Sequence, residues 1–518
     1  MGQNYPIAFS MKNKLIFFFF ALLGVILILL STSRYGAGLS YDSVGYISTA
    51  RNIIIGAGLT LYNGSPLIEQ PPLFPIILAL AGGIFRIDPL ILANIVNALV
   101  YGLILYFGGL LIFKYLSSFP VFVLIGTLAI FASIPLFTVS VMAWSEPLFI
   151  LFVILSLLFA NSYLEKNDLI SLTLLSLSIV LSTLTRYIGV VQILWGAFII
   201  TVFYRDSLKN KIAHLSLFTF ISVLPIGIWL IRNYYISNTL FGHRAPSIYT
   251  LAQNLILVFN DLMTWYIPGI IADHRPTLIL LGVVIGFIAG LNPKDSWQSM
   301  KVRLRQISPI VLFVVVYITF LVISSTTAAY DQIGDRLLSP IYVPLTLFLL
   351  ILAQILIEQY RRYFSNKVMN TFLLITLVIW LVYPIRSITI TAVNLAKIGQ
   401  GYSSKAWEES NTIKYLLQHQ TLESECTIYT NAPDAVYILA HLVTKMIPAK
   451  KFYNSQKVMY DISWLKNVWL VDNNKKCIII FYKVNREYLF AIDELQTVAS
   501  INLIAHFDDG AIYSIAKK

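Results

Sequence analysis

The sequence predicts a helical membrane domain followed by a small α/β domain, and three observations carry that prediction. Of the 518 residues, 58% are hydrophobic and 12% are charged, whereas a soluble globular protein has about 25% charged residues to solvate its surface. The mean hydropathy is +0.76. Long apolar runs fill residues 1–390, and shorter polar and apolar segments alternate over 391–518. This composition excludes a cytosolic enzyme, a secreted disulfide scaffold, a disordered chain and a collagen-like fibre.

Eleven apolar segments are candidate membrane spans, because a bilayer core of about 30 Å takes roughly 17–25 helical residues. The first follows Lys12 and Lys14 as in a secretory signal, but no clean small-residue cleavage site follows it, so we expect a retained span. Leu73–Phe85 is apolar but short, which favours an interfacial helix. The candidate spans are 15–30, 89–113, 119–138, 147–162, 169–185, 188–204, 214–232, 277–291, 309–325, 337–357 and 369–387.

The basic residues orient this arrangement. With Leu73–Phe85 in the interface, the N-terminus lies inside, and the inner loops hold fourteen basic residues, nine of them Lys. If that segment crossed the membrane, the basic residues within 361–367 would lie outside, against the positive-inside rule. The net charge of +12 therefore does not indicate nucleic-acid binding. We expect a multi-pass protein of the cell (inner) membrane, in contact with its lipids, with a cytoplasmic N-terminus.

The outer loops hold nine Arg and no Lys. Arginine clamps phosphate through two parallel hydrogen bonds, so these residues are candidates for binding a lipid phosphate. Anchoring in the headgroup region is the alternative explanation for each of them. The nine are Arg34, Arg51, Arg86, Arg186, Arg232, Arg244, Arg275, Arg336 and Arg386.

Residues 391–518 predict an α/β domain that the span count places outside the membrane. We expect helices at Ala406–His419 and Pro433–Leu442, and strands at Cys426–Thr430 and Cys477–Lys483. Two further strands, Ile501–Phe507 and Ala511–Ile515, flank the turn signal Asp508-Asp509-Gly510 and are expected to pair.

Both cysteines of the chain, Cys426 and Cys477, fall in this domain. In an oxidising compartment they are able to form a disulfide. Two buried thiols on apolar strands are the simpler interpretation, and the sequence leaves the pairing open.

Three carboxylates gather at the outer rim of the predicted membrane domain. Asp42 follows the first span, Glu69 precedes the interfacial helix, and Glu146 begins the fourth span. Acidic residues are rare in this membrane domain and are therefore candidates for a functional site. Each also has a structural interpretation: Asp42 as a helix cap, Glu69 as a solvated loop residue and Glu146 as a favourable charge at a helix N-terminus.

These motifs resemble the GT-C membrane glycosyltransferases, in particular the bacterial protein O-mannosyltransferase and aminoarabinose-transferase families. The similarity rests on Asp42, on Glu69-Gln70-Pro71-Pro72-Leu73 and on Glu146-Pro147-Leu148, with weaker similarity at Ile231–Tyr234 and Gly334–Leu337. It covers residues 1–390 in layout. The resemblance implies a GT-C-like domain with about 11 transmembrane helices, and a sugar donor linked to a polyprenyl phosphate.

The resemblance also implies roles for individual residues. Asp42 takes the position of the family's catalytic base, and Glu146 that of a later acidic residue. Gln70 stands where the family has a Lys, so an outer arginine must supply the missing charge, with Arg51 or Arg336 as the first choices. The candidate substrate-binding residues are Tyr46, Arg51, Glu69, Gln70, Glu146, Arg232, Arg244 and Arg336.

Metal use stays open. Some members of the family use a divalent metal ion with outer carboxylates and others need none. Glu69, Glu146, His243 and His274 are the candidate ligands, although two isolated histidines far apart in a loop are more often not ligands. No other cofactor is expected.

The predicted reaction is transfer of a hexosyl or pentosyl group with inversion at the anomeric carbon. Trp265 and Tyr266, in the outer loop 236–276, are either a sugar-stacking lid or part of an interfacial aromatic belt. A transporter or flippase of lipid-linked sugars is the main alternative function, and a non-catalytic envelope assembly protein is the next. The sequence does not identify the sugar, the oligomeric state or the acceptor, which is a lipid, a glycan or a protein.

Overall fold

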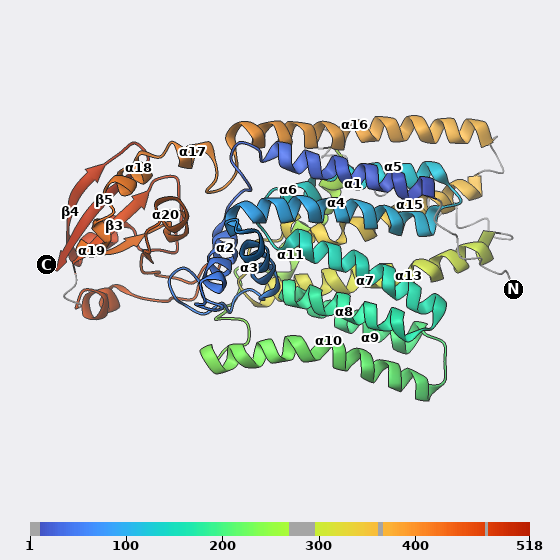
Figure 1. Cartoon of the computed structure of the whole chain (residues 1–518), viewed down its shortest axis with the longest axis horizontal. Coiled ribbons are helices and arrows are strands. Elements are labelled where there is room, and N and C mark those ends of the chain that lie inside the picture. Colours follow the sequence, from blue (N-terminus) through green and yellow to red (C-terminus); the bar gives the residue numbers. More distant parts are fainter. Residues whose placement is uncertain (1–10, 269–295, 361–365, 472–474, 518) are drawn as a thin grey trace.

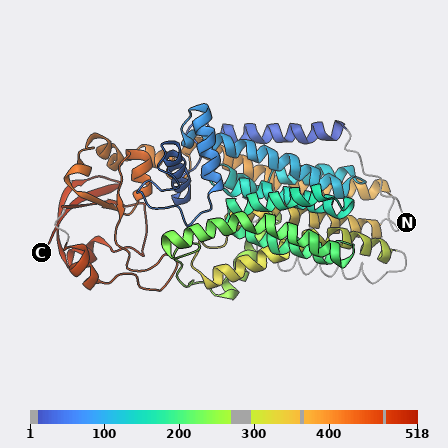
Figure 2. The ribbon, with the colours of Figure 1, turned by 60° about the horizontal axis from the view of Figure 1, so that its bottom comes forward.

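The computed structural model describes residues 11–268, 296–360, 366–471 and 475–517. A bundle of long helices carries a smaller domain with a β-sheet at one end (Figure 1). The same two parts are seen after rotation about the long axis (Figure 2). The helical bundle, which comes first in the sequence, and the C-terminal sheet domain thus lie end to end along the long axis of the molecule.

Ten of the eleven candidate spans coincide with helices of this bundle, and 277–291 lies outside the described residues. Seven described helices are long and apolar enough to cross a membrane, or eight if the bent pair α5 and α6 is one span. Two shorter apolar helical segments, Leu169–Thr185 and Tyr187–Phe203, account for two more candidates. The bounds are α1 Met11–Ser31, α4 Pro89–Leu116, α5 Pro120–Phe131, α6 Ile134–Ser140, α7 Glu146–Lys166, α8 Leu169–Thr185, η1 Tyr187–Gly189, α9 Val190–Phe198, η2 Ile199–Phe203, α10 Leu208–Ser237, α13 Ser296–Thr327, η4 Ser339–Ile341, α15 Tyr342–Tyr360 and α16 Asn366–Ile398.

Local sequence signals set several of these helix ends. Asp88 caps α4 by accepting a hydrogen bond from the Leu90 backbone N–H, and proline follows it at the first helical position. Asn167 and Asn238 end α7 and α10 in the left-handed conformation that asparagine tolerates. Small residues then allow close packing: a Cβ on Gly109 of α4 would lie 2.6 Å from the Phe17 ring of α1.

The end of the bundle that faces the C-terminal domain carries four further helices, α2 (Tyr41–Ile54), α3 (Leu73–Phe85), α11 (Leu251–Tyr266) and α14 (Asp335–Leu338). Figure 1 shows α2 and α3 beside each other at this end rather than along the bundle, as expected of interfacial helices. The described part of the predicted outer loop 236–276 contains α11, whose start is capped by Thr250. Arg386 was placed in an outer loop, but it lies inside α16, because that helix continues to Ile398.

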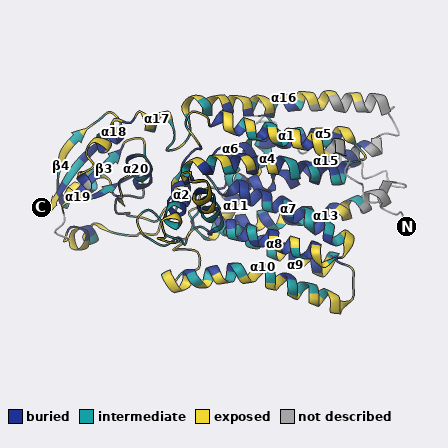
Figure 3. Ribbon diagram, in the orientation of Figure 1, coloured by how far each residue is buried: buried dark blue, intermediate teal, exposed yellow. Residues whose placement is uncertain are grey.

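The middle of the bundle is buried, whereas the outward faces of its outer helices are exposed and apolar. Figure 3 shows exposed residues along the outward faces of α1, α10 and α16, and buried residues in the middle of the bundle. Apolar side chains such as Phe18, Leu30 and Ile228 are among the exposed ones. A bundle whose outer face is this apolar is suited to lipid rather than to water.

The C-terminal domain is built on a five-stranded sheet of order β2-β1-β3-β5-β4. The strands β2, β1 and β3 run parallel, and β5 pairs antiparallel with both β3 and β4. The expected hairpin is confirmed, whereas the expected helix 406–419 is two short helices, and β2 was not expected. The elements are α17 Lys405–Glu408, α18 Asn411–Gln418, α19 Leu422–Glu425, β1 Thr427–Thr430, α20 Pro433–Ala440, β2 Lys445–Met446, α21 Ile462–Trp464, η5 Leu465–Trp469, β3 Lys476–Phe481, α22 Ile492–Gln496, β4 Ala499–His506 and β5 Gly510–Lys517.

Cys426 and Cys477 form a disulfide, with their Cα atoms 5.9 Å apart. The simpler interpretation of two free thiols is therefore wrong. The parallel pairing places Cys477 opposite Ile428, so Cys426 at the start of β1 comes within bonding distance of it. The bond joins the first and third strands of the domain across 51 residues of sequence.

The C-terminal domain is docked on the loop that joins α2 to α3. The Tyr62 ring stacks on Tyr437 of α20 with 4.6 Å between ring centroids, and the Tyr62 hydroxyl donates to Asp434 Oδ1 over 3.2 Å. Arg486 binds the second carboxylate oxygen of Asp434 at 3.3 Å. Backbone hydrogen bonds near residue 400 also connect the start of the C-terminal domain to the segment before α2, where Tyr402 N–H donates to Leu39 O.

Candidate active site

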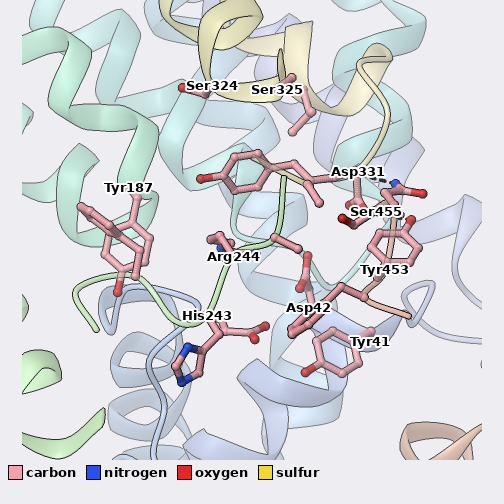
Figure 4. Close-up of a pocket in the computed structure, with 18 of the residues that line it drawn as sticks. Tyr41, Asp42, Tyr187, His243, Arg244, Ser324, Ser325, Asp331, Tyr453 and Ser455 are labelled. Atoms are coloured by element: carbon pink, nitrogen blue, oxygen red, sulfur yellow. Dashed lines mark hydrogen bonds between the residues drawn. The ribbon is translucent and has the colours of Figure 1, made fainter. Parts of the chain in front are cut away.

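A cavity of about 1340 Å³ lies between the C-terminal domain and the end of the bundle that carries α2 and α14. Both domains line it: Tyr41, Asp42 and Arg336 come from the bundle side, and Tyr453 and Arg486 from the C-terminal domain. Figure 4 shows Asp42 and Tyr453 at one side of the pocket and Tyr187 at the other. Two of the three predicted carboxylates, Asp42 and Glu69, thus share one cavity with Arg244 and Arg336.

Asp42 lies in the first turn of α2, whose start is fixed by other side chains. Ser40 and Ser43 form a capping box, and Trp144 Nε1 donates to Ser40 Oγ over 2.7 Å. The side chain of Asp42 therefore does not serve as the cap and is free to face the cavity. Gln70 Nε2 donates to its Oδ1 atom over 2.9 Å.

Arg336 of α14 connects three carboxylates. Its Nη2 donates to Asp42, its Nε to Glu146, and its Nη1 to Asp331 at 3.0 Å. The guanidinium also lies over the Trp144 ring, 4.2 Å from the centroid. Arg336 is thus the centre of an ion-pair network rather than an unpaired cation.

Glu146 stands behind this network at the start of α7, with only 1% of its side chain exposed. Its Oε1 atom pairs with both Arg336 and Arg186, the latter at the C-terminal end of α8. Among the described residues, its Oε2 atom has no hydrogen-bond partner. Glu146 therefore positions two arginines and does not itself line the cavity.

Two of the carboxylates that line the cavity, Asp42 and Glu69, have pKa values shifted in opposite directions. Burial raises the pKa of Asp42, but the charge and hydrogen bond of Arg336 outweigh it, so the pKa lies below its ordinary value. For Glu69, burial raises the pKa and Asp42 adds to the effect, while Arg244 opposes it, leaving the pKa above its ordinary value. Asp42 is accordingly ionised first as the pH rises.

Arg244 is a cavity cation of a different kind. Among the described residues it forms no ion pair, and its guanidinium lies 4.8 Å from the centre of the Tyr330 ring. The Arg244 charge acts on Glu69, whose pKa it lowers against the effect of burial. An incoming anion would therefore meet Arg244 without displacing a carboxylate from it.

Two of the expected arginines are engaged elsewhere. Arg51 binds Asp88 with two hydrogen bonds of 3.0 Å and lies over Tyr437, outside the cavity. Arg232 donates to the backbone carbonyls of Leu67 and Leu59, also away from the cavity lining. Arg51 is thus not placed to supply the charge missing at Gln70.

One wall of the cavity is largely apolar. It is lined by one face of α13, at Tyr317, Phe320, Leu321, Ser324 and Ser325, a spacing of three to four residues that repeats with the helical turn. Ile188, Val190 and Phe241 continue this surface. The cavity therefore has a charged region beside a wall of aromatic and aliphatic side chains with two serines.

The described donor set does not fit a divalent metal ion. Among the described residues, no group of three or more His, Cys, Asp and Glu side chains is close enough to hold one. Glu69 and His243 line the cavity, Glu146 is held by two arginines, and His274 lies outside the described residues.

The structure brings most of the expected site residues together. Those that line the cavity are Asp42, Tyr46, Glu69, Gln70, His243, Arg244 and Arg336. Trp265 and Tyr266 do not: Trp265 donates to Asp335, and Tyr266 stacks on Tyr342. Arg186, Asp331 and the lining residues from the C-terminal domain were not among the predicted site residues. Only Arg186 carried a signal in the sequence, as one of the nine arginines of the lysine-free outer loops.

Comparison with known proteins identifies the fold. No protein-family model matches the chain, and no curated protein matches its sequence. ArnT from Cupriavidus metallidurans in the apo state is similar, with a TM-score of 0.62 at 11% identity over 96% of this chain and 97% of that chain. The same protein bound to undecaprenyl phosphate gives a TM-score of 0.61 at 13% identity over the same shares. The chain thus has an ArnT-like fold, and the expected fold class is confirmed.

Proposed function

We propose that this protein is a membrane glycosyltransferase that moves a sugar from a polyprenyl-phosphate donor to an acceptor outside the cell membrane. The observation that carries the proposal is the cavity in which Asp42, two arginines and the apolar face of α13 meet. The ArnT-like fold supports it, since one of the similar ArnT structures is bound to undecaprenyl phosphate. The disulfide supports an outer location for this end, because disulfides persist in oxidising compartments.

In the proposed complex the two halves of the cavity bind the two halves of the donor. The prenyl chain lies along the groove formed by Phe320 and Leu321, where it removes apolar surface from water. The phosphate meets Arg244, whose guanidinium has no carboxylate partner among the described residues. The sugar then reaches the region of Asp42.

Asp42 acts as the general base in this proposal. It takes the proton of the acceptor's nucleophile as that atom bonds to the anomeric carbon, and the carbon–phosphate-oxygen bond breaks with its electron pair leaving on the phosphate. The developing phosphate charge is stabilised by Arg244 and Arg336 rather than by an acid. Attack from the side opposite the leaving group inverts the anomeric carbon.

In this proposal the contact with Arg336 controls how strong a base Asp42 is. While Arg336 holds Asp42, the pKa of Asp42 stays low and the carboxylate is a weak base. A donor phosphate competes for the same guanidinium, and as Arg336 turns toward it the pKa of Asp42 rises toward its ordinary value. Donor binding thereby strengthens the base next to the sugar that is to be transferred.

The test is a reconstituted transfer reaction. The purified full chain in lipid nanodiscs is mixed with a panel of synthetic polyprenyl-phosphate hexoses and pentoses and with an outer-envelope extract as acceptor, and loss of sugar from each donor is measured. We expect one donor to react, with inversion, and Asp42→Asn to lose about 10³-fold in rate while still binding undecaprenyl phosphate. Transfer by Asp42→Asn at the wild-type rate would remove Asp42 as the base. Movement of an intact donor across the bilayer without transfer would support a transporter instead.

A further inference from the structure

The C-terminal domain reaches the cavity through a hairpin at residues 449–458. Lys451 pairs with Val458 in an antiparallel bridge, and Ala449 pairs with Leu489 of the same domain. Phe452 N–H donates to Lys457 O over 3.0 Å and closes the tip. Asn454 lies at this tip with φ of 47°, a left-handed conformation that asparagine accepts at low cost.

The tip of the hairpin is bound to two loops of the membrane domain. Asn454 Nδ2 donates to Tyr330 O over 2.8 Å, and Ile248 N–H donates to Asn454 O over 3.2 Å. The Tyr453 hydroxyl donates to Asp331 Oδ1 over 3.3 Å. Figure 4 shows Tyr453 and Asp331 at the same side of the pocket.

These contacts fall on the residues that support two of the cavity arginines, Arg244 and Arg336. Tyr330, whose carbonyl binds the hairpin, carries Arg244 over its ring. Asp331 binds Tyr453 with one carboxylate oxygen and Arg336 Nη1 with the other, at 3.0 Å. Arg336 in turn binds Asp42. A continuous chain of polar contacts therefore joins the C-terminal domain to the proposed base.

We propose that the tip of this hairpin is part of the active site, and that Tyr453 is a positioning residue that acts on Asp42 through Asp331 and Arg336. The proposal rests on the proposed function for its catalytic consequence, but the structural coupling stands on the contacts alone. It gives the C-terminal domain a role in the reaction that its position in the sequence does not indicate.

The expected effect is moderate. The side chain of Asp331 is 50% exposed, so its contact with Tyr453 competes with water. Loss of one such hydrogen bond to a charged group corresponds to about a 3- to 10-fold change in rate or affinity. Removing the charge of Asp331 should cost more, because Arg336 then loses an ion pair as well.

A double-mutant cycle distinguishes a relay from independent effects. Tyr453→Phe, Asp331→Asn and the double variant are compared with wild type in nanodiscs, by kcat/KM for the donor that reacts and by the Kd for undecaprenyl phosphate. Tyr482→Phe is the matched control, since it makes the same change on an exposed tyrosine of the same domain that does not line the cavity.

For a relay, Tyr453→Phe lowers kcat/KM and raises the Kd, each by about 3- to 10-fold, and the double variant is no worse than Asp331→Asn alone. Tyr482→Phe stays at the wild-type level, and all four variants melt within a few degrees of wild type. Losses that multiply, or a Tyr453→Phe variant equal to wild type, would overturn the proposal. If wild type transfers no sugar but binds undecaprenyl phosphate, the proposed function fails while the Kd cycle still decides the coupling. A wild type that neither transfers nor binds overturns both.

Discussion

Two clusters of arginine and carboxylate lie at the junction of the domains, and they differ in what reaches them. Arg336 joins Asp42, Glu146 and Asp331, and 22% of the Asp42 side chain remains exposed in the cavity. Arg486 binds Asp434, of which 1% is exposed, and Tyr62 closes the other side. A ligand is therefore able to reach the first cluster's carboxylate and not the second's.

The difference also appears in the balance between burial and charge. At Asp434, burial raises the pKa more than Arg486 lowers it, so the pKa lies above its ordinary value. At Asp42, the Arg336 charge wins over burial. The comparison teaches that an arginine–carboxylate contact becomes a candidate for catalysis when the carboxylate is open to the cavity and its pKa is lowered, whereas the closed pair serves docking.

The largest expected effect is a difference between two Asp→Asn variants, one at Asp42 and one at Asp434. Asp42→Asn should lower the transfer rate by about 10³-fold with a small change in melting temperature. Asp434→Asn should do the reverse, lowering the free energy of unfolding by about 1–3 kcal/mol because Arg486 loses its charged partner. At a temperature where the Asp434→Asn variant is folded, its transfer rate should remain within about 3-fold of wild type, because Asp42 is unchanged. Equal activity losses in the two variants would end the distinction between the clusters.

The disulfide sharpens the assignment of the C-terminal domain as a docked, oxidised unit. Replacing Cys426 and Cys477 by serine removes a cross-link over 51 residues, which should cost about 3–4 kcal/mol of unfolding free energy. Protease resistance of the domain in urea measures the loss, with reductant on wild type as an independent route to the same state. Unchanged resistance in the serine variants would mean that packing alone holds the domain.

Arg244 and Arg51 form a matched pair for the phosphate contact. Arg244→Ala should raise the Kd for undecaprenyl phosphate by about 10- to 100-fold, since a charge-assisted contact is lost. Arg51→Ala should leave it within about 2-fold, because Arg51 is bound to Asp88 outside the cavity. A larger increase in Kd for Arg51→Ala than for Arg244→Ala would support Arg51, one of the two arginines chosen from the sequence, as the phosphate-binding residue.

The smallest effect is on pH dependence. The lowered pKa of Asp42 places the acid limb of kcat/KM below the ordinary aspartate value of about 3.9. In Arg336→Gln burial remains and the guanidinium is gone, so the acid limb should move to higher pH. The linked stability has the same sign: the Asp42 contribution is present above the unfolded pKa and is lost as the pH falls through the folded one. An acid limb that stays in place would mean that another group titrates there.

The helices were predictable because an apolar run of spanning length is a local property. The rim carboxylates were predictable for the same reason, as rare charges beside such runs. The choice among arginines was not. Arg51 forms an ion pair with Asp88, which holds it away from the cavity, and Asp88 also caps α4. This contact depends on how α2 packs against α4. Nothing in the spacing of the two residues indicates it.

The C-terminal contribution was equally out of reach of the sequence. Tyr453 and Asp331 are separated by 122 positions and meet only after the domain has docked. Tyrosine and asparagine at a hairpin tip are also ordinary turn and surface residues, so they carried no signal. The pairing of the cysteines depended in the same way on the parallel register of β1 and β3.

A structure of the full chain with undecaprenyl phosphate bound is the most direct test of the central claim, that base and lipid phosphate meet in one cavity. The account predicts the prenyl chain along Phe320 and Leu321, the phosphate between Arg244 and Arg336, and Arg336 shifted away from Asp42. A phosphate bound on another face of the bundle, with the Arg336–Asp42 contact unchanged, would contradict it.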